Sequence, residues 1–183
     1  MKISILKENR PFEDRVSCTP EIVKKLIKLG LNVSIESNAG SASSYSDSDY
    51  KGVGANIEKA QKMLLSKADI IFSVRRPDLK TIKFFKKDSV LISQMEPFSN
   101  PSDLKDFAKA SITSFALEQV PRISRAQSMD VLSSQSNLAG YRAIIEASQS
   151  YSRAFPMMMT AAGTIPPARV LIMGVGVAGL QAI

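Results

Sequence analysis

The sequence predicts an α/β fold, with a mostly parallel sheet covered by helices on both faces. Apolar runs rich in Ile and Val alternate with segments in which apolar residues recur at helical spacing. Near the C-terminus, the apolar run 169–173 leads directly into a turn with three glycines. With 183 residues, of which 44% are apolar, the chain can bury the core of one domain and the start of a second.

The order of the elements follows from these runs and from the residues that interrupt them. Thr19 can cap a helix that has Pro20 at its first position and ends at Gly30. A Ser-rich stretch with Gly40 predicts a loop before a short helix at 47–51. The predicted strands are 2–6, 32–36, 69–74, 88–92 and 111–117, and the other predicted helices are 57–66, one that starts at 101, and a long one that begins at 128–130 and runs through 147.

Composition excludes several classes of protein. The single cysteine, Cys18, allows no internal disulfide, so the reducing cytosol is the expected compartment. The chain has no His and no cluster of Cys or carboxylates, and no metal site is expected. The most apolar region is interrupted by proline and glycine, so we expect neither a membrane span nor, given the charged first residues, a signal peptide.

The net charge of +7 is concentrated in residues 59–87, which hold nine basic and two acidic residues. Two interpretations stay open. The lysines can form the solvated faces of surface helices, or they can form a cationic patch that faces an anionic partner or a cofactor phosphate. Neither interleaved aromatic residues nor a nucleic-acid-binding motif accompanies the charge, so no nucleic acid partner is expected.

The glycine turn has the G-x-G-x-x-G spacing of a dinucleotide-binding fingerprint. The first glycine allows the tight bend, the second lets a diphosphate approach the backbone, and the third lets the next helix pack closely, with its N-terminus toward the phosphates. The predicted cofactor-binding residues are Gly174, Gly176, Val177, Ala178 and Gly179. The alternative is an ordinary Gly-rich turn between a strand and a helix.

The acidic residue that binds the ribose in such sites follows about 20 residues later, beyond Ile183. We therefore predict a Rossmann-like first domain, followed by the first strand and turn of a second, truncated Rossmann domain. The predicted segments are an N-terminal α/β domain at 1–128, a connecting helical segment at 129–163 and the start of the NAD-binding domain at 164–183. Residues 170–173 would then lack strand partners within the chain.

Two longer motifs resemble a known family. Residues 121–142 read PRISRAQSMDVLSSQSNLAGYR, and residues 155–164 read FPMMMTAAGT. Both closely resemble the NAD(H)-binding component, the alpha subunit, of proton-translocating NAD(P) transhydrogenase. The resemblance starts at Lys7 and Glu8, includes Arg15 and Val16, and extends to the last residue. The alanine dehydrogenases share this architecture.

The resemblance implies roles for four residues of the polar loop and helix start. Arg122, Gln127, Asp130 and Ser133 would form the catalytic centre, where they hold the nicotinamide end of NADH and shape its contact with NADP. Asp130 and Ser133 lie three residues apart on one helical face, and the Gln127 amide can both donate and accept hydrogen bonds. Composition alone leaves open a linker followed by a solvated helix, with Arg122 as an ordinary loop residue.

The resemblance also implies the reaction and the partners. The reaction would be hydride transfer from NADH to NADP+, coupled to proton translocation by other subunits. The partners would be a second copy in a homodimer, an NADP(H)-binding beta subunit and a membrane domain. The protein would be cytoplasmic and peripheral to the inner membrane through those partners. On its own the chain is expected to be inactive, and a non-catalytic remnant of the same subunit is the alternative.

Histidine distinguishes this chain from an alanine dehydrogenase. Those enzymes resemble it but use a His as acid/base beside a substrate-binding Arg and Lys. Here Arg15 is present, Arg75 stands at the Lys position, and the expected His position falls in Ser93-Gln94-Met95-Glu96-Pro97. Amino-acid oxidation needs such a base, whereas hydride transfer between two nicotinamide rings needs only their alignment and closeness.

Overall fold

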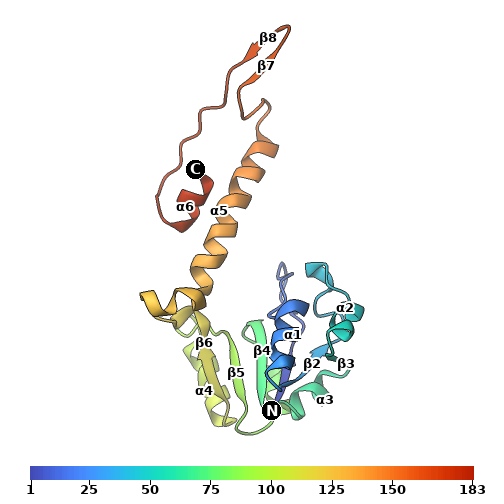
Figure 1. Ribbon diagram of the computed structural model, residues 1–183. Coiled ribbons are helices and arrows are strands. Elements are labelled where there is room, and N and C mark those ends of the chain that lie inside the picture. Colours follow the sequence, from blue (N-terminus) through green and yellow to red (C-terminus); the bar gives the residue numbers. More distant parts are fainter. The chain divides into compact units, whose positions relative to one another are not determined.

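The computed structural model describes all 183 residues and contains two compact units, Met1–Val120 and Pro121–Ile183 (Figure 1). The division into three segments made from the sequence stays a prediction. None of the helices combines the length and the apolar composition that crossing a membrane requires.

The first unit is built on a six-stranded sheet in which every neighbouring pair of strands is parallel. The strand order is β3-β2-β1-β4-β5-β6. The strands are β1 (Lys2–Ile5), β2 (Asn32–Glu36), β3 (Asn56–Glu58), β4 (Ile70–Arg75), β5 (Val90–Gln94) and β6 (Thr113–Ala116). The chain adds strands outward from β1 to β3 and then returns to place β4 on the other side of β1. This is the order of a Rossmann-type sheet, and the predicted fold class is confirmed.

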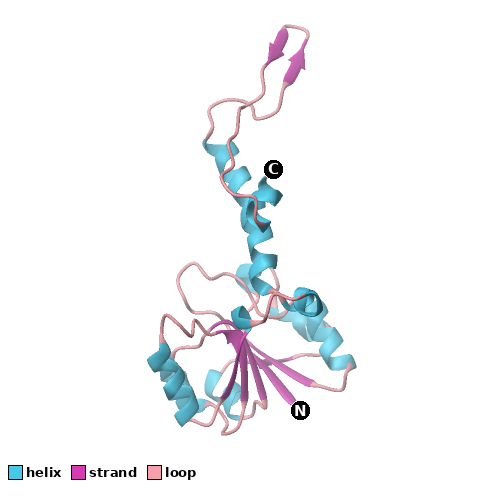
Figure 2. Cartoon of the chain, turned by 90° about the vertical axis from the view of Figure 1, so that its left-hand side faces the viewer, coloured by secondary structure: helices cyan, strands magenta, loops and turns pink.

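Helices cover both faces of this sheet, as Figure 2 shows. The helices are α1 (Pro20–Lys28), α2 (Asp47–Gly52), α3 (Gln61–Ser66) and α4 (Pro101–Lys109), joined by the 3-10 turns η1 (Ser41–Ser43), η2 (Leu79–Phe84) and η3 (Leu117–Gln119). Val23 of α1 and Tyr50 of α2 belong to one buried cluster, and Leu65 of α3 and Phe107 of α4 belong to another. The two clusters are the cores on the two sides of the sheet.

The sequence of β1 shows how one strand serves both cores. Ile3 and Ile5 are buried in the cluster that includes α1 and α2. Ser4, between them, points the other way because side chains alternate along a strand. It is buried, and its Oγ donates a hydrogen bond to the Leu64 carbonyl of α3 at 3.0 Å. The start of α1 is as predicted, with Thr19 at the N-cap position and Pro20 in the first turn, but the Thr19 side chain makes no capping hydrogen bond.

The predicted helix at 57–66 is wrong in its first half. Residues Asn56–Glu58 form β3, which pairs in parallel with β2, and α3 begins only at Gln61. A three-residue strand at the sheet edge contains a single apolar residue, Ile57, and therefore has no periodicity for sequence reasoning to detect. Its conformation is set by hydrogen bonding to β2, a tertiary interaction.

The second unit contains the predicted long helix. This helix, α5 (Val131–Ser150), follows the 3-10 turn η4 (Ser124–Met129) and has Asp130 as its N-cap. A two-stranded antiparallel hairpin, β7 (Met158–Thr160) and β8 (Gly163–Ile165), comes next, and the chain ends with α6 (Val177–Ala182). The hairpin is not among the predicted elements.

The prediction of a strand at 169–173 is wrong for this structure. These residues belong to no sheet, because a strand needs a neighbour for its backbone hydrogen bonds and the chain offers none here. The lack of strand partners is as expected, but the end of the chain still packs against the rest of the second unit. Helix α6 lies beside α5 (Figure 1).

We expect Leu91→Ala to destabilise the first unit by about 2 to 5 kcal/mol, because Leu91 is fully buried on β5 and its truncation leaves a cavity. Urea unfolding followed by circular dichroism measures this change. Leu29→Ala is the matched control, since the Leu29 side chain is 76% exposed, and should change the free energy of unfolding by less than about 0.5 kcal/mol. Equal effects of the two substitutions would contradict the assigned core.

Candidate functional site

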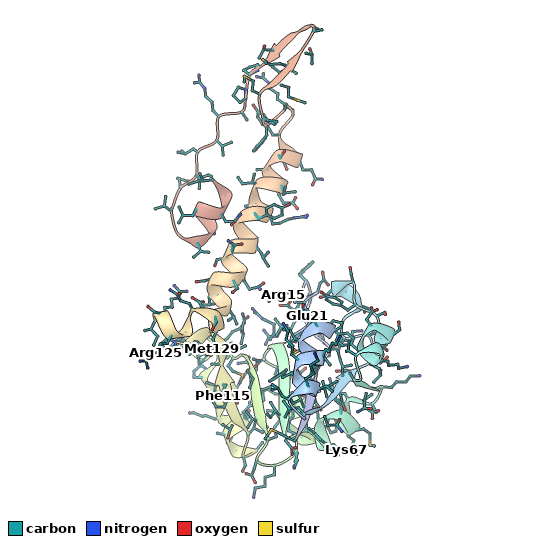
Figure 3. The ribbon with its side chains drawn as sticks, in the orientation of Figure 1. Arg15, Glu21, Lys67, Phe115, Arg125 and Met129 are labelled. Carbon is teal, nitrogen blue, oxygen red and sulfur yellow. The ribbon has the colours of Figure 1, made fainter.

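The turn η4 presents the first of the predicted site residues. Ala126 is buried and anchors the turn, and the Ala126 N–H donates to the Ile123 carbonyl at 2.9 Å. Gln127, the next residue, is exposed, and its carbonyl accepts a hydrogen bond from the Asp130 N–H at 3.3 Å. The side chains of Arg125 and Met129, labelled in Figure 3, mark the same turn. The turn therefore carries Gln127 at the surface, directly before the helix start.

Asp130 and Ser133 form a closed hydrogen-bonded pair at the start of α5. The Ser133 N–H donates to Asp130 Oδ1 at 2.9 Å, and Ser133 Oγ donates to Asp130 Oδ2 at 2.6 Å. These bonds from Ser133, together with the nearby Arg122 guanidinium, hold the pKa of Asp130 below its usual value. Asp130 is thus ionised at neutral pH, and it caps the helix while its carboxylate oxygens keep further lone pairs for a ligand.

One open cavity of about 610 Å³ joins all four predicted residues. Its lining consists of Arg122, Ile123, Ser124, Gln127, Asp130 and Ser133. Arg122 Nε lies 4.0 Å from Asp130 Oδ2, and its side chain is 69% exposed, so the guanidinium can still contact a ligand. The cavity has the size of an ordinary small-molecule pocket and combines a cation, a carboxylate, an amide and hydroxyls.

The glycine turn has the geometry that a diphosphate-binding turn requires. Gly174 adopts φ +106°, which residues with a Cβ rarely adopt. A Cβ at Gly176, the N-cap of α6, would have open space around it, so the backbone there is accessible. A Cβ at Gly179 would lie 1.9 Å from the Gly174 carbonyl oxygen, so only glycine lets the helix pack this closely against the turn. Gly174 and Gly179 thus meet backbone requirements of the turn, and Gly176 leaves open space where a dinucleotide's diphosphate can approach.

The other two predicted cofactor-binding residues, Val177 and Ala178, form the first turn of α6. The glycine turn and the four-residue cavity both belong to the second unit. The structure brings Arg122, Gln127, Asp130 and Ser133 together in one cavity, and Gly174 through Gly179 in one turn.

The first unit has a separate charged cluster at the carboxyl ends of β1, β4 and β5. Glu96 forms ion pairs with Arg75 and, at 3.5 Å, with Arg10. Arg15 pairs with Glu13 at 2.6 Å. Sequence reasoning identified Arg15 and Arg75 but missed their carboxylate partners. Within the stretch Ser93–Pro97, where the resemblance places the histidine base of an alanine dehydrogenase, the chain has a carboxylate, Glu96, that is ion-paired with two arginines.

Glu8 is a further residue of this edge that sequence reasoning did not assign. Its carboxylate accepts the backbone N–H groups of Val74, at 2.7 Å, and Arg75, at 3.2 Å. Burial raises the pKa of Glu8. The available signal was a charged residue two positions after the predicted strand at 2–6. The nearby Arg76 is buried and pairs with Asp103 at 2.8 Å. The basic run 59–87 is thus not one open patch, although some of its lysines, such as Lys67 in Figure 3, are exposed.

Two domain families match the chain one after the other. The N-terminal domain of alanine dehydrogenase/PNT matches residues 4–139, and the C-terminal domain of the same family matches residues 143–183. The chain belongs to the alanine dehydrogenase/PNT family. Within this family the sequence is 51% identical, over 188 residues, to the first part of the NAD(P) transhydrogenase alpha subunit of Rhodospirillum rubrum. That alignment covers 100% of this chain and 49% of the relative.

Solved structures give the same assignment. The crystal structure of transhydrogenase from Sinorhizobium meliloti matches with a TM-score of 0.95 and 48% identity, over 100% of this chain and 54% of that chain. An L-alanine dehydrogenase matches with a TM-score of 0.83 and 26% identity, over 100% and 50% of the two chains. The resemblance to the transhydrogenase alpha subunit is confirmed, and the chain spans about half the length of these relatives.

The structure separates two roles of Asp130, as helix cap and as ligand-binding residue. Asp130→Ala removes the acceptor for the Ser133 N–H, so we expect a lower helix content and a lower unfolding midpoint for the second unit. Asp130→Asn keeps one acceptor but loses the charge and the second carboxylate oxygen, so it should lower both by less than Asp130→Ala does. Since the pKa of Asp130 is lowered by folding, its contribution is present above its unfolded pKa and lost as the pH falls through its folded pKa. Far-UV circular dichroism of both variants measures this, and equal losses would contradict the capping role.

Proposed function

We propose that this chain is the N-terminal part of the NAD(H)-binding alpha component of an NAD(P) transhydrogenase. The proposed reaction is hydride transfer from NADH to NADP+, coupled to proton translocation by other subunits. One observation carries the proposal. A single cavity is lined by Arg122, Gln127, Asp130 and Ser133, and it lies in the unit that also holds the glycine turn. The names of the relatives and the family matches support it.

The residues of the cavity suit the binding of a nicotinamide. A carboxamide presents one oxygen acceptor and two N–H donors. The ionised Asp130 can accept an N–H, the Gln127 amide can accept and donate, and the Ser133 hydroxyl, which already donates to Asp130, can still accept. When bound, NADH supplies the hydride, so this chain's residues have to orient the ring and exclude water, and no proton has to be taken up.

The diphosphate is assigned to the turn Gly174–Gly179. The accessible backbone at Gly176 and the first turn of α6, with Val177 and Ala178, supply N–H groups at the start of a helix. An anion is favoured there because the helix dipole adds positive partial charge. NADP(H) is assigned to a partner component, the beta subunit, and proton translocation to a membrane domain. The chain would lie on the cytoplasmic side of the inner membrane and be held there by those partners.

An alanine dehydrogenase activity is disfavoured by the chemistry of the first unit. Amino-acid oxidation needs a group that takes a proton at neutral pH. The chain has no His, and Glu96 is held by two arginines. Ring-to-ring hydride transfer makes no such demand.

The proposal is tested by shortening Gln127 in the assembly that contains this chain. We expect Gln127→Asn to lower the rate of hydride transfer by about 100-fold and to change NADH affinity little, because a displacement of about one ångström is costly for the chemical step. Stopped-flow absorbance with an NADP+ analogue gives the rate, and NADH fluorescence gives the affinity. Gln149→Asn, an exposed amide near the end of α5, is the matched control. A wild-type assembly that neither binds NADH nor transfers hydride would refute the proposed function.

We also propose that the chain forms a homodimer. Met158 and Met159 on β7 and Ile165 on β8 are exposed, although a two-stranded hairpin is marginally stable by itself in water. Exposed apolar patches of this kind mark protein interfaces.

Sedimentation velocity of the chain tests the homodimer. We expect two copies per particle and a shift toward monomer, by at least about tenfold in dissociation constant, for Met159→Asp, which places a charge in an apolar interface. Met63→Asp is the control, since Met63 is also exposed but lies on α3 of the first unit. A monomer at all concentrations would contradict the homodimer.

A further inference from the structure

One face of α5 carries the residues that are proposed to bind the nicotinamide and also the contacts with α6. Asp130, Ser133, Asn137, Gly140 and Ile144 follow one another at spacings of three or four residues, so they lie in a single stripe along the helix. The first two line the cavity assigned to the nicotinamide. The next three face α6.

Gly140 is the point of closest approach between the two helices. It is the buried residue of α5. A Cβ built on it would lie 2.1 Å from the Ala178 carbonyl oxygen and 3.0 Å from Ala178 Cα. Neither atom can move away easily, because both belong to the backbone of α6. Glycine costs about 1 kcal/mol relative to alanine inside a helix, so this position combines an unfavourable helix propensity with a steric requirement.

One further contact holds α6 in the same place. Asn137 Nδ2 donates to Gln181 Oε1 at 2.7 Å, one turn before Gly140 on α5 and one turn after Ala178 on α6. Ile144, one turn after Gly140, lines an apolar hollow together with Ala182 and Ile183 at the end of the chain. Helix α6 is thus held against α5 at Gly140 and, one turn earlier on α5, at Asn137.

We propose that Gly140 and the Asn137–Gln181 pair are positioning residues, which set the spacing between the diphosphate turn and the nicotinamide-side residues. This inference rests on the proposed function. In NADH a single ribose separates the diphosphate from the nicotinamide, so the two sub-sites have to keep one spacing. Seven residues separate Ser133 from Gly140, or about 10 Å along the helix axis. Because α5 is one continuous helix, it fixes that length, and the contacts at Gly140 and Asn137 join α6 to it.

Gly140→Ala gives the first test. In the assembly that contains this chain, we expect NADH affinity to fall by about tenfold or more, because the added methyl pushes the start of α6 away from α5. We also expect faster hydrogen exchange of the α6 amides, with the helix content of α5 unchanged or increased, since alanine favours helix. Gly52→Ala is the matched control, because a Cβ at Gly52 meets nothing within 4 Å, and it should leave affinity unchanged.

The hydrogen-bonded pair gives a second test that does not depend on steric clash. Asn137→Ala and Gln181→Ala should each lower NADH affinity by about three- to tenfold, the range that one net hydrogen bond contributes. The double variant should lose no more than either single one. The exchanged pair, Asn137→Gln with Gln181→Asn, keeps the combined side-chain length and should bring affinity to within about twofold of wild type.

The outcomes separate this inference from the proposed function. If the wild-type assembly does not bind NADH, the proposed function fails. If it binds NADH but Gly140→Ala and Asn137→Ala bind it as tightly, with unchanged exchange of the α6 amides, the positioning role is refuted. If affinity falls only together with helix content of α5, the two residues stabilise the fold and do not set the spacing, which also refutes the inference.

Discussion

The first unit depends on the requirement that a parallel sheet be buried on both faces. Strand β1 pairs with β2 on one side and β4 on the other, so its alternation of Ile and Ser decides which side chains enter each core. The cluster that includes α1 and α2 receives Ile3 and Ile5. The opposite face receives Ser4, whose hydroxyl bonds to the backbone of α3. A shift of β1 by one residue would turn Ile3 and Ile5 toward the opposite face of the sheet and Ser4 toward α1 and α2, so both cores would lose the β1 side chains that belong to them.

The carboxyl edge of the same sheet holds the charged cluster of the first unit. Charged residues gather where the carboxyl ends of parallel strands meet, which is where ligands bind in open α/β sheets. In this chain those charges form ion pairs. Glu96 is paired with Arg10 and Arg75, and Asp103 is paired with Arg76. The chemistry proposed above belongs to the second unit.

The second unit depends on a single long helix. Asp130 caps α5 and at the same time lines the cavity, so the interaction that starts the helix also orients a candidate ligand-binding carboxylate. Further along the same face, Gly140 gives up helix propensity to let α6 approach. Both exceptional residues are glycines. Gly140 lies within a helix where two backbones have to come close, and Gly174 has a positive φ where the backbone bends sharply. Such exceptions to local preference are expected at functional sites.

The sequence by itself determined the alternation of strands and helices, the start of α1 at Pro20, the long helix after Asp130 and the glycine turn, because each leaves a periodic or steric signal over neighbouring residues. It also predicted the four cavity residues, through the resemblance of one continuous motif. It did not predict β3, the hairpin β7–β8 or the non-strand conformation of residues 169–173, since strand formation depends on which segments are neighbours in space. Only the tertiary structure decided that Glu96 binds Arg10 and Arg75, and that Gly140 meets Ala178, 38 residues further along the chain. These contacts join segments far apart in sequence. Their energies come from close approach in space, which a local sequence pattern does not indicate.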